Sequence, residues 1–317
     1  MIALAVSLLL PLAFHAPDSP LALMPAPVLL APSTPAPARG ADLRDLRMVV
    51  VGDTGEPGPI VERWRKIVAA LPKDAVLVPG DLIYEQAPPC PDGTPDPGSL
   101  AIYDHRVGHA LGDLGAPTYL VIGNHDVSWT RGEPPRERCL VAYAAMRKAQ
   151  GLVFPTSVYA VDLGLAMLIV LDTNHFTDRP YDPQATFAKS VIASMKDGQR
   201  LILSGHHVLR TYGDKDDEDR LQPWLARHGL RPDLWINGHA HVQQFGIYGG
   251  IAALTSGTGA APRDRPTCPP TCGEGQLFGS SEPGFTVVRV AGPDRHFEID
   301  IQSADGKSLY QWNEARP

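Results

Sequence analysis

Cysteine, positive charge and long hydrophobic runs are all scarce in this chain. Only four of its 317 residues are cysteine, and no second Cys-x-x-Cys-like pair is present, which disfavours a zinc site built from thiolates. The formal net charge is −7 and the pI is near 5.9, so the chain has no basic excess for a nucleic-acid backbone and no nucleic-acid partner is expected. Since 44% of the residues are hydrophobic, one large core is within reach.

An apolar run opens the chain at residues 2–14 and is shorter than the roughly 20 residues that a membrane span needs. Its length matches the hydrophobic region of a signal peptide, so residues 1–16 are expected to direct export to the periplasm or the cell exterior. Residues 17–44 are rich in Pro and Ala and are expected to form an extended, disordered linker. The alternative is a membrane tether through an uncleaved N-terminal segment. Otherwise no stable membrane insertion is expected, and residues 45–317 are expected to form one domain.

An exported chain with four cysteines is expected to contain disulfides. Cys268 and Cys272 are close enough in sequence to close a small loop, which leaves Cys90 and Cys139 to form the second bridge. The two other pairings remain open.

Hydrophobic periodicity and turn residues predict alternating strands and helices over most of the chain. Strands are expected at 47–51, 75–78, 118–122, 200–204 and 233–236, and helices at 58–70, 100–113, 136–150, 184–196 and 217–229. A hairpin that turns at Gly164 is also expected, and the chain from Val242 onward is mostly strands. Alternating βα units followed by a run of strands favour an α/β (α+β) fold of two packed sheets with helices outside.

Seven potential metal ligands stand where expected strands end, in short motifs that contain glycine. They are Asp53 in GDTG, Asp81 and Tyr84 in GDLIY, Asn124 in GNHD, His206 in GHH, and His239 and His241 in GHAH. Glycine lets the backbone turn sharply at a strand end, so these side chains can point into one cleft. The set contains no sulfur, which favours zinc, iron or manganese over copper(I). Free tyrosine has a pKa of about 10, so the phenol of Tyr84 indicates a strongly Lewis-acidic ferric ion at one position.

These motifs resemble those of the calcineurin-like metallophosphoesterases, and among them the small, tartrate-resistant type of purple acid phosphatase. Many metallophosphoesterases begin with Asp-x-His, whereas this chain has Asp53-Thr54-Gly55 without the histidine. Its second motif, residues 80–84, resembles the GDxxY of the purple enzymes, in which a tyrosine takes that position at the iron. The resemblance covers roughly residues 45–300 and implies a four-layer αββα sandwich of two mixed β-sheets flanked by helices.

Carried over position by position, the resemblance implies two metal sites that share Asp81. Fe(III) would be held by Asp53, Asp81, Tyr84 and His241, and a divalent ion (Fe, Zn or Mn) by Asp81, Asn124, His206 and His239. The implied function is hydrolysis of phosphomonoesters by in-line attack of a metal-bound hydroxide.

His125, beside Asn124, matches the residue that family members use to protonate the leaving group, and Asp126 is expected to orient its ring or raise its pKa. His207, His175 and Arg263 are candidates for contacts with a small phosphoester substrate. Two alternatives stay open: a phosphodiesterase or pyrophosphatase on the same metals, and a non-catalytic metal- or phosphate-binding surface protein.

Overall fold

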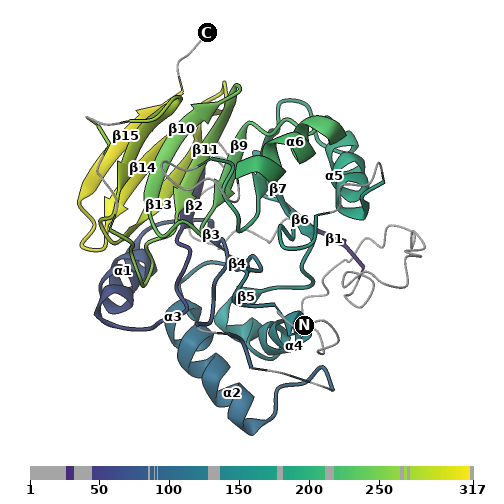
Figure 1. Cartoon of the computed structure of the whole chain (residues 1–317), viewed down its shortest axis with the longest axis vertical. Coiled ribbons are helices and arrows are strands. Elements are labelled where there is room, and N and C mark those ends of the chain that lie inside the picture. Colours follow the sequence, from purple (N-terminus) through teal and green to yellow (C-terminus); the bar gives the residue numbers. More distant parts are fainter. Residues whose placement is uncertain are drawn as a thin grey trace.

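The computed structural model describes residues 26–31, 45–84, 86–88, 90, 92–127, 136–176, 181–210, 218–264, 268–269 and 272–314. Its strands form two mixed sheets with helices on their outer sides, which confirms the predicted fold class (Figure 1). The first sheet has, in spatial order, β1 (Val28–Leu30), β6 (Tyr159–Asp162), β7 (Ala166–Val170), β8 (Arg200–Ser204), β9 (Leu234–Asn237), β11 (Ile251–Ser256), β10 (Gln243–Tyr248) and β12 (Gln276–Ser280). The second has β15 (Ser308–Asn313), β14 (His296–Ser303), β13 (Gly284–Ala291), β2 (Leu46–Val50), β3 (Ala75–Val78), β4 (Thr118–Leu120) and β5 (Leu152–Val153).

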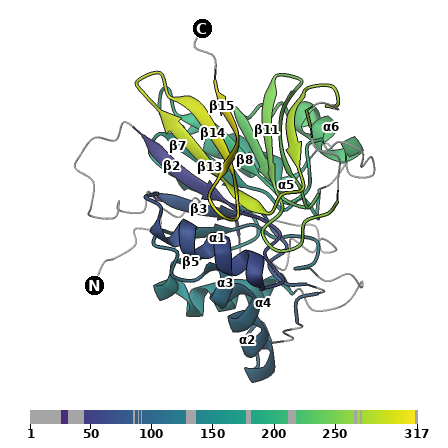
Figure 2. The same cartoon turned by 90° about the vertical axis from the view of Figure 1, so that its left-hand side faces the viewer.

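The helices are divided between the two outer faces. They are α1 (Pro59–Ala70), α2 (Pro97–Tyr103), α3 (His109–Leu111), α4 (Glu137–Met146), α5 (Pro183–Ala193) and α6 (Glu218–His228). Helices α5 and α6 flank the first sheet, whereas α1 to α4 gather on the side of β3 and β5 (Figures 1 and 2). A sheet with one face toward the other sheet and one toward helices must be apolar on both faces.

Strand β7 shows how sequence produces these layers. Leu168 and Val170 belong to the cluster that fills the space between the sheets, with Ile202 and Ile236 from β8 and β9. The alternate residue Ile169 belongs to the outer cluster, where it packs with side chains of α5 and α6 such as Trp224. Because successive strand residues point to opposite faces, a continuous apolar run such as AMLIV is buried on both sides.

Parallel pairing brings the strand ends together. β2, β3 and β4 run parallel in the second sheet, and β7, β8 and β9 run parallel in the first. The carboxyl ends of β2, β3, β4, β8 and β9 carry the loops that contain the predicted ligands, so the candidate site lies where the two sheets meet at this edge.

Several predicted elements differ from the structure. The helix predicted at 100–113 is divided into α2, a π-helical turn at Asp104–Gly108 and α3, and β5 was not predicted. The expectation of a disordered linker over 17–44 is wrong for Val28–Leu30, because these three apolar residues pair in parallel with β6 at the edge of the first sheet. The signal-peptide-like segment 1–16 and most of the linker lie outside the described residues and stay predictions.

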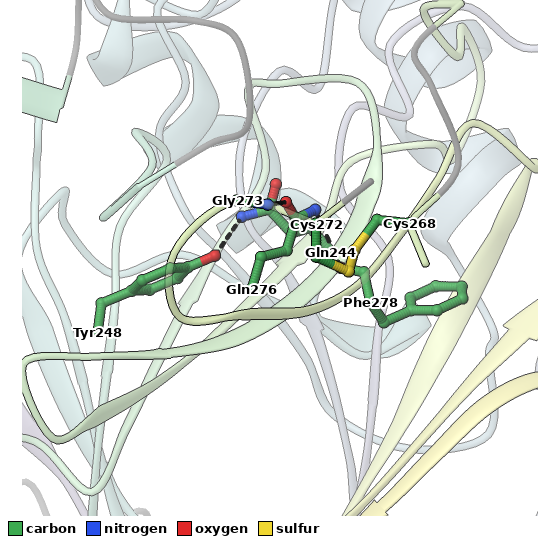
Figure 3. Close-up of a disulfide and its surroundings, with 7 residues drawn as sticks. All are labelled: Gln244, Tyr248, Cys268, Cys272, Gly273, Gln276 and Phe278. Carbon is green, nitrogen blue, oxygen red and sulfur yellow. Dashed lines mark hydrogen bonds between the residues drawn. A yellow bond between two sulfur atoms is a disulfide. The ribbon is translucent and has the colours of Figure 1, made fainter. Parts of the chain in front are cut away.

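One of the two predicted disulfides is present. Cys268 and Cys272 are bonded, with their Cα atoms 4.9 Å apart, beside Phe278 and Gln276 of β12 (Figure 3). The Cys90–Cys139 bridge is a wrong prediction, since both residues are free and buried. The Sγ atom of Cys139, in the first turn of α4, faces the carbonyl oxygen of Pro88 at 3.8 Å instead of a second thiol. Within the described part of the chain, none of the helices has the length and apolar character of a membrane span.

Candidate metal centre

The structure brings all seven predicted ligands into one cluster, in two contact groups. In the first group, the phenolic oxygen of Tyr84 lies 3.2 Å from Asp53 Oδ1, 3.1 Å from Asp81 Oδ2 and 3.1 Å from His241 Nε2. These four residues come from the loops after β2, β3 and β9. They are the same four residues that the sequence assigned to a ferric ion.

The second group surrounds the amide oxygen of Asn124. This Oδ1 atom lies 2.9 Å from His206 Nε2 and 3.0 Å from His239 Nδ1, and these two ring nitrogens are 3.1 Å apart. His206 Nε2 also lies 3.2 Å from Asp81 Oδ1, so Asp81 contacts both groups, one through each carboxylate oxygen. That arrangement is what a bridging carboxylate requires.

The outer nitrogens of two histidines are held by backbone carbonyls. His206 Nδ1 donates to the carbonyl oxygen of Pro79 at 2.8 Å, and His241 Nδ1 donates to that of Ala261. A carbonyl oxygen can only accept, so in each ring the proton sits on Nδ1 and the Nε2 lone pair points into the cluster. This is the usual way in which a protein orients a histidine ligand.

The backbone at the cluster is strained. Asp53, Asp81, His239 and His241 all have positive φ, between 52° and 71°, a region that non-glycine residues rarely occupy. Gly123 and Gly238 lie against the carboxylates of Asp81 and Asp53, where a Cβ atom would collide with a carboxylate oxygen. Strain of this kind persists only where the surrounding packing imposes it, and it commonly accompanies a functional site.

The electrostatics of the first group fit a bound cation. Asp53 and Asp81 are 0% and 1% exposed, and single ligand atoms of these two residues and His206 all lie within 4.8 Å of one another. Burial raises the pKa of Asp53 well above its usual range, and the charge of Asp81 adds to this effect. Burial and these two carboxylates likewise raise the pKa of Tyr84. Two carboxylates, a phenol and imidazoles in one buried cluster are the donor set of a hard or borderline metal ion.

The second group is electrostatically linked to the first. Burial lowers the pKa of His206, but Asp81 beside it outweighs burial and raises that pKa to about 9. Burial would raise the pKa of Asp81, whereas His206 and His125 hold it below its usual range. A bound cation would replace the proton that the raised pKa places on the His206 ring nitrogen in the cluster, because a metal and a proton compete for the same lone pair.

His125 borders the cluster from the loop after β4. Its side chain is 27% exposed, its Nε2 lies 4.0 Å from Asp81 Oδ2, and its ring meets Tyr84 edge to face at 4.8 Å between centroids. The backbone N–H of His125 donates to Asp81 Oδ1 at 3.1 Å. It therefore combines a fixed position with access to solvent, as a proton donor to substrate requires.

Asp126 has contacts other than those predicted. Its carboxylate accepts hydrogen bonds from the backbone N–H groups of Leu82, Ile83 and Gly123, at 2.8 to 3.2 Å. It is buried and, through these contacts, holds the loop of Asp81 against the loop of Asn124. Burial, with the nearby charge of Asp81, raises its pKa to about 7. The expectation that Asp126 orients the ring of His125 is therefore corrected: its carboxylate positions backbone.

The three predicted substrate residues lie at different places around the cluster. His207 lies beside it, with its ring 4.6 Å from that of His239. His175 lies in the loop after β7, and its Nδ1 pairs with the buried carboxylate of Asp172 at 2.8 Å. Arg263 is exposed, and its backbone N–H donates to the carbonyl oxygen of His241 at 2.9 Å. Their contacts with substrate stay a prediction.

One neighbouring residue, Thr173, carries no signal in the motifs. It follows β7, and its hydroxyl contacts the backbone of His206 and His207. The signal that points to it is its place in the sequence LDTNH, a polar segment after an apolar strand like those that contain the ligands.

Comparison with known proteins gives a family and several similar folds. The family described as Calcineurin-like phosphoesterase matches residues 46–243. A "Probable cyclic nucleotide phosphodiesterase" of Psychrobacter arcticus is 28% identical over 195 residues, which are 58% of this chain and 62% of that protein. The chain thus spans less than two thirds of the length of that curated relative.

Two solved structures share the fold. A purple acid phosphatase from yellow lupin (Lupinus luteus) seeds has a TM-score of 0.61 at 16% identity, over 85% of this chain and 53% of the other. A Plasmodium protein described as "GAP50 the anchor in the inner membrane complex" has a TM-score of 0.60 at 16% identity, over 85% and 88%. At this identity the likeness concerns the fold alone.

Proposed function

The chain belongs to the calcineurin-like phosphoesterase family, and we propose that it is an exported two-metal phosphatase of the purple acid type that hydrolyses phosphomonoesters. The observation that carries this proposal is the position of Tyr84. Its phenolic oxygen contacts Asp53, Asp81 and His241 at 3.1 to 3.2 Å, in the place of a ligand. A phenolate at this place favours Fe(III) over a second divalent ion.

The residues that would hold the metals form two sets. Asp53, Asp81, Tyr84 and His241 would hold Fe(III), and Asp81, Asn124, His206 and His239 a divalent Fe, Zn or Mn. When bound, such a pair neutralises the phosphoryl group and activates a water molecule for in-line attack. The backbone contacts of His206 and His241 keep both rings directed at that position before any substrate arrives.

The protein itself is proposed to supply the proton that the leaving oxygen needs when the ester bond breaks. The leaving oxygen of a phosphomonoester departs as an alkoxide unless it is protonated, and His125 stands at the exposed border of the cluster with its Nε2 4.0 Å from Asp81. We assign His125 as the donor. Two residues are proposed to contact the substrate. They are His207, whose ring lies beside that of His239 in the second contact group, and Arg263, in the segment after β11.

The absorption spectrum of the iron-loaded protein tests the proposal, measured beside the variant Tyr84→Phe. A visible band in the wild type that is absent from Tyr84→Phe is the expected result, because tyrosinate bound to a ferric ion absorbs visible light by charge transfer. Tyr310→Phe is a matched control on β15, far in sequence from every proposed ligand, and should keep the band. A metal-replete wild type without a visible band would instead favour a zinc or manganese enzyme.

A phosphodiesterase is the second candidate, because the curated relative at 28% identity is described as a probable cyclic nucleotide phosphodiesterase. Rates for a matched pair of substrates, 4-nitrophenyl phosphate and bis(4-nitrophenyl) phosphate, separate the two. A strong preference for the diester would replace the first proposal. Metals bound in full with no turnover of either ester would support a non-catalytic binding protein.

Export is part of the proposal and rests on residues 1–16. N-terminal sequencing of the protein recovered from the periplasm or the medium of its producing cell tests it, and a mature chain that begins after residue 16 is expected. Full-length protein retained in the membrane fraction would favour the uncleaved tether.

A further inference from the structure

The loop after β7, residues 172–175, supplies none of the proposed ligands yet lies against two loops that do. The amide nitrogen of Asn174 donates to the carbonyl oxygen of Gly123, which precedes Asn124, at 3.4 Å. The neighbouring hydroxyl of Thr173 contacts His206 and His207. This loop therefore joins the Asn124 and His206 loops of the second contact group.

The hydroxyl of Thr173 makes three contacts. Its Oγ1 lies 3.2 Å from the backbone nitrogen of His206, 3.1 Å from that of His207 and 2.7 Å from the Nδ1 of the His207 ring. A hydroxyl donates one proton and accepts two. Both backbone N–H groups can only donate, so they use the two acceptor positions.

The hydroxyl proton must then go to the third partner, Nδ1 of His207. An Nδ1 that accepts this proton carries none of its own, so the ring proton is on Nε2. The opposite arrangement would leave three donors directed at one oxygen, in a side chain that is 7% exposed. Such crowding is unfavourable, because it would leave a buried donor without an acceptor.

Thr173 is itself held firmly. Gln184 fixes the backbone of Asp172, the residue before Thr173. Its side chain accepts from the N–H of Asp172 at 2.8 Å and donates to the carbonyl oxygen of Asp172 at 3.0 Å. The carboxylate of Asp172 in turn accepts from the backbone and the side chain of Asn174 and pairs with His175. With both neighbours fixed, the hydroxyl has little freedom to move.

We infer that Thr173 is a positioning residue that supports the backbone of His206 and, through Nδ1, orients the His207 ring with its Nε2–H beside His239. The use of this donor rests on the proposed function: an N–H at this place suits a phosphoryl oxygen of the substrate. Thr173 thus acts on the site through two histidines without touching substrate.

The protonation pattern of His207 tests the inference in the metal-free protein. Long-range ¹H–¹⁵N spectra of histidine-labelled protein, with the His207 signals assigned through His207→Gln, distinguish Nδ1–H from Nε2–H. We expect Nε2–H in the wild type and in Thr173→Ser, and loss of the hydrogen-bond shift at Nδ1 in Thr173→Val. A wild-type ring protonated on Nδ1 would overturn the inference, whatever the variants do.

Zinc binding tests the effect on the site. Thr173→Val is expected to weaken the affinity for Zn²⁺ at one of two sites by about 10–100-fold, the usual effect of removing a group that orients a metal ligand. Thr173→Ser should stay within a few-fold of wild type. Thr118→Val is the matched control, because Thr118 is also buried, at the start of β4, and its hydroxyl donates to the backbone carbonyl of Ala116.

Failure of this inference and failure of the proposed function give different results. Unchanged Zn²⁺ affinity and unchanged Nδ1 shift in a folded Thr173→Val protein would overturn the role of Thr173 and leave the phosphatase proposal intact. A wild type that binds no Zn²⁺ and hydrolyses no phosphoester would contradict the proposed function. In that case the spectra of the metal-free protein still decide the role of Thr173.

Discussion

The phenolic oxygen of Tyr84 lies 3.1 Å from Nε2 of His241, although 157 positions separate the two residues in the chain. The same oxygen contacts one carboxylate oxygen of Asp53 and one of Asp81. A phenol has one proton and can satisfy only one of these acceptors at a time. A cation at the centre of the four groups would satisfy all of them together, which is why the position of Tyr84 carries the functional proposal.

Substitution of the carboxylate that contacts both groups should abolish metal binding. We expect Asp81→Ala to lose both metals and all measurable phosphatase activity, because Asp81 contacts Tyr84 through one oxygen and His206 through the other. Elemental analysis of purified protein and a turnover assay check this. Asp162→Ala is the control, since Asp162 pairs with Lys196 at the end of β6. Two metals retained per Asp81→Ala chain would contradict the assignment.

His125→Ala should keep both metals and slow hydrolysis by about 10²–10⁴-fold, the range for loss of a general acid. The loss should shrink for esters with good leaving groups, which need no proton, and a series of substituted phenyl phosphates measures this. The exposed His109, which pairs with Glu62, provides the control His109→Ala. An equal loss across the whole series would mean that His125 binds phosphate or supports structure instead.

Asp126 should matter for stability. Replacement by Ala leaves the buried N–H groups of Leu82, Ile83 and Gly123 without their acceptor, at a cost of about 3 kcal/mol or more. Asp126→Asn keeps one acceptor oxygen and should lose less. Denaturant unfolding of the metal-free proteins gives both values. Equal stability of wild type and Asp126→Ala would show that these contacts contribute little.

The pair of His175 and Asp172 should make stability depend on pH. Burial lowers the pKa of His175, but the charge and hydrogen bond of Asp172 outweigh burial and, with Glu137, raise it from 6.5 to about 9. A raised pKa in the folded state stabilises the protein below about pH 6.5, and this contribution is lost as the pH rises through about 9. Its upper limit is about 3 kcal/mol.

His175→Gln tests this dependence. The variant should be less stable than the wild type at pH 6, and the difference should shrink toward pH 9.5, where the wild-type imidazole is neutral as well. Unfolding free energies of the metal-free proteins at several pH values measure it. A difference that stays constant from pH 6 to 9.5 would mean that His175 contributes by packing alone.

Local pattern was a good guide wherever one segment determines its own conformation. The strands Ala75–Val78 and Arg200–Ser204 match their predicted bounds, and Gly164 turns the predicted hairpin with a φ of 82°. Such apolar runs bounded by turn residues have few alternatives. Strand β1 was missed because three apolar residues among prolines carry too little pattern, and only pairing with β6 makes them a strand.

The sequence alone was enough to identify the family and the candidate ligands, because each ligand motif contains a glycine at the end of an apolar run, and both signals are local. It was not enough to assign partners. That Asp126 holds backbone, that Cys139 faces Pro88, and that Thr173 contacts two histidines follow from how segments distant in the sequence pack against each other. Hydrogen bonds between distant segments depend on sub-ångström placement, which the packing of the whole core decides and no single motif records.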